Sequence, residues 1–353
     1  MLLCAEQAIS MNLDHYNAMR STAGYIQLQD RSWIGFVGSE RAEFLQGLLT
    51  NDVLALSCGR GCYATYLTPQ GRMIADMIVL ADQDQLLVDV HSSVKAGLHK
   101  RFDSLVFTED VAVQDLDGKF TAFGIYGPHA SEVITSVFSP AKKKFAVYEH
   151  CRIDIEGGVG LLVRTDDLGI EGYRLIVDRE VASKVLEALE RSEAVPLGPE
   201  VAETVRVESG RPLFPGDMDT DTIPLEAGIE DRAIDFDKGC YVGQEVIIRI
   251  LHRGQGRVAR RLVGLVCKKT DAHSSTLPAS GTSIYRVDSD DAVGAVTSAV
   301  WSPECNAVVA LGYLPRELAE ETGVVVDVMV DNIRVRSVVR KLPFISLPGS
   351  KDS

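Results

Sequence analysis

The sequence lacks long apolar runs and the motifs that mark the common catalytic templates. No stretch approaches the roughly 18 consecutive apolar residues that a membrane-spanning helix requires. A P-loop, a Gly-x-Ser-x-Gly elbow and a His-Glu-x-x-His pair are all absent from it. The N-terminal residues show neither a basic segment before an apolar one nor an Arg-rich amphipathic pattern. We therefore expect a cytoplasmic protein without membrane contact.

Basic residues are also in short supply. Lys and Arg number 36 against 50 Asp and Glu, which gives a formal net charge of −14. This balance argues against a general nucleic-acid binder, because such proteins gain affinity by neutralising phosphates. The seven Cys, an odd number, do not suit a disulfide framework. Cys58 and Cys62 have CxxxC spacing, but no second Cys or His pair completes a tetrahedral set, so we expect no metal site.

The hydrophobic pattern divides the chain of 353 residues into an α+β part and an all-strand part. At about 150 residues per domain, this length predicts two to three domains. Helical and strand patterns alternate at first, and after about residue 256 only short strands with Gly and Pro between them remain. Such a succession of strands predicts a small β-barrel. We expect a two-module α+β region at residues 1–256, a barrel domain at 257–345 and a tail at 346–353.

Asp76 is the most informative carboxylate. Its period-two neighbours Ile74, Ile78 and Leu80 are apolar and define a buried strand face that Asp76 shares. A carboxylate on such a face must be hydrogen-bonded, paired or open to a polar pocket, because burying a bare charge is expensive. From the spacing alone, a structural ion pair and a functional acid or base are equal alternatives.

The densest motif, residues 238–245, reads Lys-Gly-Cys-Tyr-Val-Gly-Gln-Glu and leads into a strand-like run at 246–250. Its two Gly permit a tight turn or a close approach to a ligand. Lys238 nearby would favour the thiolate of Cys240, which makes Cys240 the most reactive candidate among the thiols. The alternative is a buried Cys that fills a small core site.

A run of basic residues follows this motif directly. It comprises Arg249, His252, Arg253, Arg257, Arg260 and Arg261, with no acid among them. The preceding segment 216–237 holds eight acids and one Arg. Either the two segments pair with each other as solvated faces, or the basic segment 249–261 forms a mouth that receives a carboxylate or phosphate.

The motif at 238–245 resembles the signature of the YgfZ-type folate-binding proteins, relatives of the aminomethyltransferase (T-protein) of the glycine cleavage system. The likeness extends over nearly the whole chain. Supporting segments are residues 44–53, 71–76, 205–212, 224–229, 294–298 and 310–313. The Cys motif points to the YgfZ-type branch, and the other segments point to the superfamily. The resemblance implies a cloverleaf of two α+β modules and a C-terminal β-barrel around tetrahydrofolate or a one-carbon derivative of it.

The resemblance also implies a set of site residues. Asp76 falls where the aminomethyltransferases keep the acid beside the reactive folate nitrogens, and Arg206 where they keep a ligand-binding Arg. At Gly172-Tyr173-Arg174 they have a Gly-aromatic-Glu triplet whose Glu holds the pterin, so Arg174 removes that contact. Expected catalytic residues are Cys240 and Asp76. Expected folate-binding residues are Asp76, Tyr173, Arg174, Arg206, Glu226, Lys238, Tyr241, Gln244 and Arg249.

The Cys motif favours a tetrahydrofolate-binding accessory protein, which we expect to be a monomer. Its role would be assembly or repair of iron–sulfur clusters in client enzymes, including tRNA-modifying ones, with no direct nucleic-acid contact. One alternative is an enzyme, a tetrahydrofolate-dependent aminomethyltransferase or demethylase, which Asp76 favours and Arg174 disfavours. The other is an interaction module that docks an acidic client through the basic segment 249–261.

Overall fold

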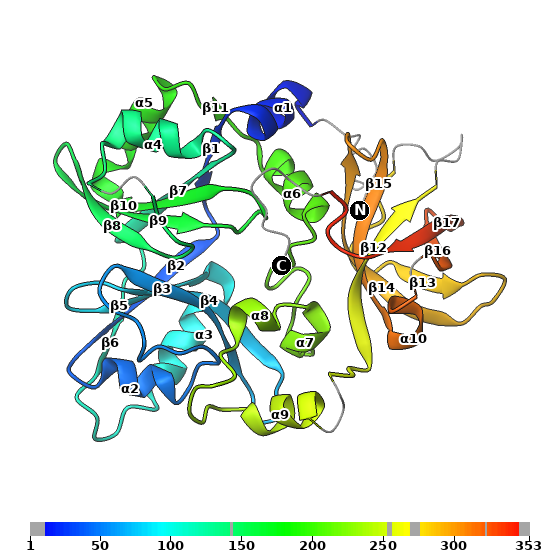
Figure 1. Ribbon diagram of the computed structural model, residues 1–353, viewed down its shortest axis with the longest axis horizontal. Coiled ribbons are helices and arrows are strands. Elements are labelled where there is room, and N and C mark those ends of the chain that lie inside the picture. Colours follow the sequence, from blue (N-terminus) through cyan, green and yellow to red (C-terminus); the bar gives the residue numbers. More distant parts are fainter. Residues whose placement is uncertain (1–10, 142–143, 253–255, 269–275, 322, 346–353) are drawn as a thin grey trace, which may run out of the picture.

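The computed structural model describes residues 11–141, 144–252, 256–268, 276–321 and 323–345. Two sheet-and-helix modules and a β-barrel lie around a central segment of short helices (Figure 1). The expected fold class, two α+β modules plus a C-terminal barrel, is confirmed. The expected tail at 346–353 lies outside the described residues. Within the described part, none of the helices has both the length and the apolar character needed to span a membrane.

The first module is a five-stranded sheet with two helices. Its strands, in spatial order, are β3 (Arg60–Leu67), β4 (Met73–Ala81), β5 (Leu86–His91), β2 (Arg31–Val37) and β6 (Ala112–Asp115). Helix α3 (Ser92–Asp103) follows β5, and α2 (Arg41–Gln46) follows β2. Apolar side chains of the sheet and of both helices join in one core, in which the rings of Phe36 and Phe102 meet edge to face.

The second module is a six-stranded sheet covered by helices on one face. Its strands, in spatial order, are β11 (Val195–Pro196), β1 (Gly24–Leu28), β7 (Phe120–Tyr126), β10 (Gly172–Asp178), β9 (Gly158–Thr165) and β8 (His150–Ile155). Helices α4 (Ala130–Phe138) and α5 (Ala182–Glu190) pack on the face that carries Leu175 and Val177. Helix α1 (Leu13–Ser21) packs beside β1 and β11.

The opposite face of the second sheet packs on the sheet of the first module. Ala122, Leu161, Val163 and Ile176 belong to the same hydrophobic core as the apolar residues of β2 to β5. Because strand side chains alternate between faces, Ile176 and Arg174 point toward the first module, whereas Leu175 and Tyr173 point toward the helices. The space between the two sheets is therefore where their polar side chains meet.

The third module is a closed barrel. Its strands, in spatial order, are β12 (Arg260–Cys267), β15 (Ala307–Pro315), β14 (Ala292–Ser302), β13 (Ser283–Arg286), β16 (Val325–Val330) and β17 (Ile333–Arg340). Helix α10 (Arg316–Ala319) follows β15. Helix α6 (Pro199–Glu208) lies between the second module and the barrel, where its Val207 shares a small core with Val309 and Leu311 (Figure 1).

The central segment continues through α7 (Pro224–Ala227) and α8 (Glu230–Ala233) to α9 (Gln244–His252). The sequence prediction of a strand at 246–250 is wrong, because this run lies inside α9. Its β-branched residues suggest a strand, but Ile247, Ile250 and Leu251 recur at helical spacing and all pack on the first module's core. The boundary expected near residue 256 falls between α9 and β12.

Candidate functional site

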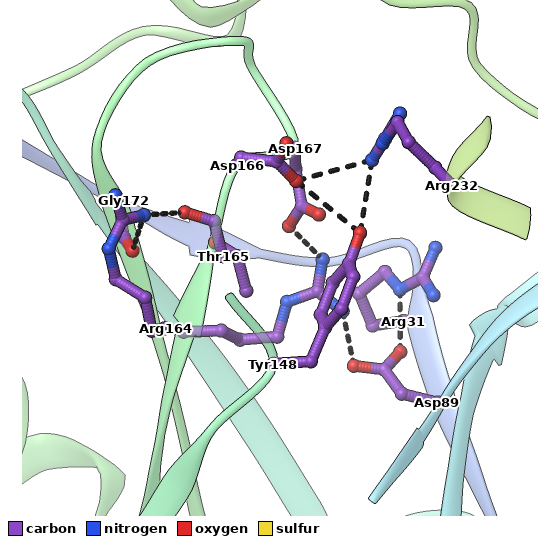
Figure 2. A network of polar contacts seen from close by, with 10 residues as sticks. Arg31, Asp89, Tyr148, Arg164, Thr165, Asp166, Asp167, Gly172 and Arg232 are labelled. Carbon is purple, nitrogen blue, oxygen red and sulfur yellow. Dashed lines mark hydrogen bonds and ion pairs between the residues drawn. The ribbon is translucent and has the colours of Figure 1, made fainter. Parts of the chain in front are cut away.

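A cluster of charged residues occupies the space between the two sheets. We call it the central cluster. Its members are Arg31, Arg174, Arg211 and Arg232 with Asp76, Asp89, Asp166 and Asp167. They come from β2, β4, β5 and β10, from the turn after β9, from the chain after α6 and from α8. Figure 2 shows most of this network from close by.

Asp76 is the only carboxylate of the central cluster for which no Arg ion pair occurs among the described residues. It lies on β4, and its Oδ2 accepts a hydrogen bond of 2.8 Å from the Tyr63 hydroxyl on β3. Its surroundings remove most of its hydration but leave it partly accessible to solvent. This desolvation raises the pKa of Asp76, although Arg31, the Tyr63 hydrogen bond and Arg232 all favour the carboxylate. Asp76 is therefore suited to take up and release a proton.

Asp89 is the most deeply buried acid of the cluster, with 1% of its surface exposed. One carboxylate oxygen accepts from Nε of Arg31 at 2.7 Å, and the other pairs with Arg174. Burial alone would raise the pKa of Asp89, but the two Arg hold it below the ordinary value. Arg174 also donates to Asp167 at 2.6 Å, so it joins the two sheets through two carboxylates.

The third part of the cluster joins the central segment to β9. Arg232 of α8 donates to the Tyr148 hydroxyl at 3.0 Å and to Asp166 at 3.2 Å (Figure 2). Arg211 donates to the other oxygen of Asp166 at 2.6 Å. The rings of Tyr63 and Tyr148 lie nearly parallel, with centroids 6.5 Å apart. The Arg232 guanidinium lies 4.9 Å from the centroid of the Tyr63 ring.

Two buried polar atoms of this region lack a hydrogen-bond partner among the described residues: Nε of Arg174 and Oγ1 of Thr165. Buried polar groups in native proteins are almost always satisfied, so these atoms indicate a place for water or a polar ligand. Together with Asp76, they place an acid and unused hydrogen-bonding capacity in the space between the two sheets. An acid near unsatisfied polar groups suits a polar ring such as a pterin.

Two of the expected folate-binding residues, Tyr173 and Arg206, make their contacts outside the central cluster. Tyr173 lies in the core under α4, on the face of β10 opposite to Arg174, and its ring meets Phe145 edge to face. Arg206 of α6 donates to Glu203, to Asp217, to the Arg211 carbonyl and to Ser298 Oγ on the barrel. Its contacts thus join α6 to the barrel.

The Lys at the start of the Cys motif also has a structural setting. Nζ of Lys238 donates to the carbonyls of Gln46, Leu49 and Asn51 at 2.7 to 2.9 Å, where α2 ends. Burial lowers the pKa of Lys238 to about 8. Its charge acts on the thiol of Cys62, whose pKa burial nonetheless raises to about 12. All three Nζ donors are thus engaged with backbone carbonyls.

The other motif residues divide between core and surface. Tyr241 is buried in the first module's core, and burial raises its pKa to about 12. Cys240 is exposed, which excludes the alternative of a buried Cys that fills a core site. Gln244, at the start of α9, is partly buried. Glu226 and Arg249 line a separate pocket beside α9, away from Asp76.

Gly243 of the motif fixes α9 to the β3–β4 hairpin. It has φ +86°, and an added Cβ would lie 2.6 Å from the Thr68 carbonyl oxygen. We therefore expect Gly243→Ala to lower the free energy of unfolding by about 2 kcal/mol, measured by chemical denaturation. Gly239→Ala is the matched control, because a Cβ there meets no atom within 4 Å. Equal stability of the two variants would show that the hairpin contact is unimportant.

Sequence reasoning missed most members of the central cluster and the neighbours of Asp76. Asp89 carried the same signal as Asp76, because it interrupts the apolar run Leu86, Leu87, Val88 and Val90. Arg31, Tyr63 and Arg232 carried no such signal, since only the packing of three separate segments brings them together.

Comparisons with known proteins agree with this architecture. A family model for the GCVT N-terminal domain matches residues 6–238, and one for the glycine cleavage T-protein C-terminal barrel domain matches 260–345. A Nostoc sp. aminomethyltransferase is 28% identical over 93% of this chain and 86% of its own length. The Bacillus subtilis aminomethyltransferase is 27% identical over 96% of this chain and 91% of its own. A crystal structure of glycine cleavage system aminomethyltransferase T from Bartonella henselae has the same fold, with a TM-score of 0.84, 19% identity and coverage of 96% and 91% of the two chains.

Proposed function

The chain belongs to the GCVT family, with its N-terminal domain and its T-protein C-terminal barrel, and from this we propose that it is a tetrahydrofolate-dependent aminomethyltransferase or demethylase. The proposal is supported by the aminomethyltransferases that match nearly its whole length. The observation that carries it is Asp76, a partly accessible acid with a raised pKa that is free of Arg ion pairs among the described residues.

This proposal replaces the accessory role in iron–sulfur cluster assembly favoured from the Cys motif. Curated relatives from several bacteria are named aminomethyltransferases, which supports the enzyme alternative over the accessory role. Iron–sulfur clients and a link to tRNA therefore have no support. The narrower assignment to the YgfZ-type branch rests on the motif at 238–245 alone. We assign no chemical step to Cys240.

The residues of the central cluster have distinct roles in the proposed reaction. Tetrahydrofolate, when bound, would supply the nitrogen that bonds to the one-carbon unit, while the donor's bond to that carbon breaks and its electron pair leaves with the donor. Asp76 takes the proton that such a nitrogen loses, and Tyr63 orients the carboxylate through its hydrogen bond. Arg31 and Arg232 stabilise the ionised form of Asp76, so that it can act as a base despite its burial.

The unusual feature of this site is Arg174. Its guanidinium pairs with Asp89 and Asp167, and because a guanidinium has only donors it offers no acceptor to the N–H donors of a pterin. Asp89 and Asp166 are likewise ion-paired with Arg residues. Among the described residues, Asp76 is then the carboxylate of the cluster that no Arg engages, and its Oδ1 is left to accept from a ligand. We propose that it both orients the ring and transfers the proton.

Calorimetric titration of the purified protein with tetrahydrofolate tests the proposal. We expect binding at one site per chain, and equal affinity for the Cys240→Ala variant, because Cys240 lies outside the central cluster. Absence of binding at millimolar tetrahydrofolate would refute the proposed function. If Cys240→Ala bound tetrahydrofolate more weakly than the wild-type protein, Cys240 would instead belong to the folate-binding site.

A further inference from the structure

A second pocket lies at the turn of the β3–β4 hairpin, between α7, α9 and the start of the barrel. Its volume is about 550 Å³. Three Arg line it, namely Arg72, Arg249 and Arg257, together with one acid, Glu226. Apolar side chains, among them Ile250 and Val258, complete the wall. We call it the hairpin pocket.

The charges around the hairpin pocket do not balance. Glu226 is paired with Arg260 at 3.0 Å, and Asp221 at its rim is paired with Arg72 at 2.9 Å. Arg249 and Arg257 are exposed, and neither has an ion pair among the described residues. The surplus is therefore two positive charges, in a protein with a net charge of −14.

One further acid lies within electrostatic reach of this surplus. This acid is Glu320, whose pKa is lowered most by a hydrogen bond of 2.5 Å from Arg316. The charges of Arg261 and Arg257 lower the same pKa to a smaller extent. Glu320 is thus already paired and leaves the charge of Arg257 available. Two uncompensated guanidinium groups at one pocket are typical of a site for carboxylates or phosphates.

The hairpin pocket is connected to Asp76 by strand β4. Arg72 directly precedes the strand, and Asp76 lies four residues further on. At about 3.3 Å per residue, the two positions are roughly 13 Å apart along the strand. A ligand with its ring at Asp76 and an extended acidic tail along β4 would therefore bring the tail carboxylates to Arg72, Arg249 and Arg257.

We propose that the hairpin pocket binds the γ-linked glutamate tail of the folate, through ion pairs of its carboxylates with Arg249 and Arg257. This inference rests on the proposed function for the identity of the ligand. The apolar wall formed by Ile250 and Val258 packs against the methylene groups of the tail. Longer tails bind more tightly, because each added glutamate brings another carboxylate to the same arginines.

The test compares dissociation constants for three ligands: tetrahydropteroyl monoglutamate, tetrahydropteroyl triglutamate and free γ-linked triglutamate. We expect the wild-type protein to bind the tetrahydropteroyl triglutamate about tenfold more tightly than the monoglutamate. In the Arg249→Gln/Arg257→Gln variant this ratio falls to about one. The control Arg191→Gln/Arg340→Gln removes the same charge from exposed positions in the other modules and keeps the ratio.

The outcomes separate this inference from the proposed function. A wild-type ratio near one, or a ratio that survives in Arg249→Gln/Arg257→Gln, overturns the tail site while leaving the folate proposal intact. If neither tetrahydropteroyl compound binds, the proposed function fails. Free triglutamate then decides the anion site: binding that the double variant abolishes supports it, and absence of binding overturns it.

Discussion

Asp89→Asn is expected to lower the free energy of unfolding by about 3–5 kcal/mol, because it leaves the buried guanidinium groups of Arg31 and Arg174 without their shared anion. Chemical denaturation of the two proteins measures this difference. The Asn side chain keeps the shape of Asp89, so the loss reports charge rather than packing. A large loss would identify this buried ion pair as a main link between the two sheets.

The control for Asp89→Asn is Asp290→Asn, which breaks an ion pair between Arg334 and a fully exposed Asp. Surface pairs of this kind contribute about 0–1 kcal/mol. The pH dependence gives a second check. Because the folded-state pKa of Asp89 lies below its ordinary value, its stabilisation is present above the unfolded pKa and is lost as the pH falls through the folded one. Equal losses for the two variants would contradict this role.

Asp76→Asn is expected to reduce one-carbon transfer to tetrahydrofolate by about 10²–10⁴-fold, because the amide cannot accept the proton that the folate nitrogen releases. The free energy of unfolding of this variant should not fall, although its transfer rate does. The raised pKa of Asp76 means that its neutral form is favoured in the folded state, and its contribution to stability is lost as the pH rises through that pKa. Denaturation and transfer rates measured on one preparation separate the two effects.

The pH profile identifies Asp76 more specifically than the loss of rate. We expect an acidic limb in kcat/KM that lies above the ordinary range of an Asp and that Asp76→Asn abolishes. Tyr63→Phe should move this limb to higher pH, because the lost hydrogen bond had favoured the ionised carboxylate. A limb unchanged in both variants would assign the proton transfer to another group.

Much of the fold could be predicted from the sequence. The succession of short strands predicted after about residue 256 agrees with the barrel strands β12 to β17, because alternating apolar residues between turn residues reflect a single buried face. The strand predicted at residues 246–250 is wrong, because a short run of Val and Ile suits a strand or a helix equally. Only the packing of α9 on the β3–β4 hairpin decides between a strand and a helix for this run.

The site was less predictable than the fold. The position of Asp76 on an apolar strand face predicted a buried carboxylate with a role, but it could not supply Tyr63 or Arg232 as neighbours. The Cys motif was the densest signal, yet its Lys, Tyr and second Gly are used to fix the end of α2 and the hairpin. The dense Cys motif therefore reflects close backbone packing, whereas the residues with unusual charge environments are dispersed along the sequence.

Folate-dependent transfer is tested most directly by NMR that follows a ¹³C-labelled carbon from an aminomethyl donor in the presence of purified wild-type protein. We expect the label to appear in methylene-tetrahydrofolate only when protein, donor and tetrahydrofolate are all present. The rate should fall to near the uncatalysed level in Asp76→Asn and remain unchanged in Cys240→Ala. Bound tetrahydrofolate without any label transfer would contradict the assignment of this protein as a folate-dependent transferase.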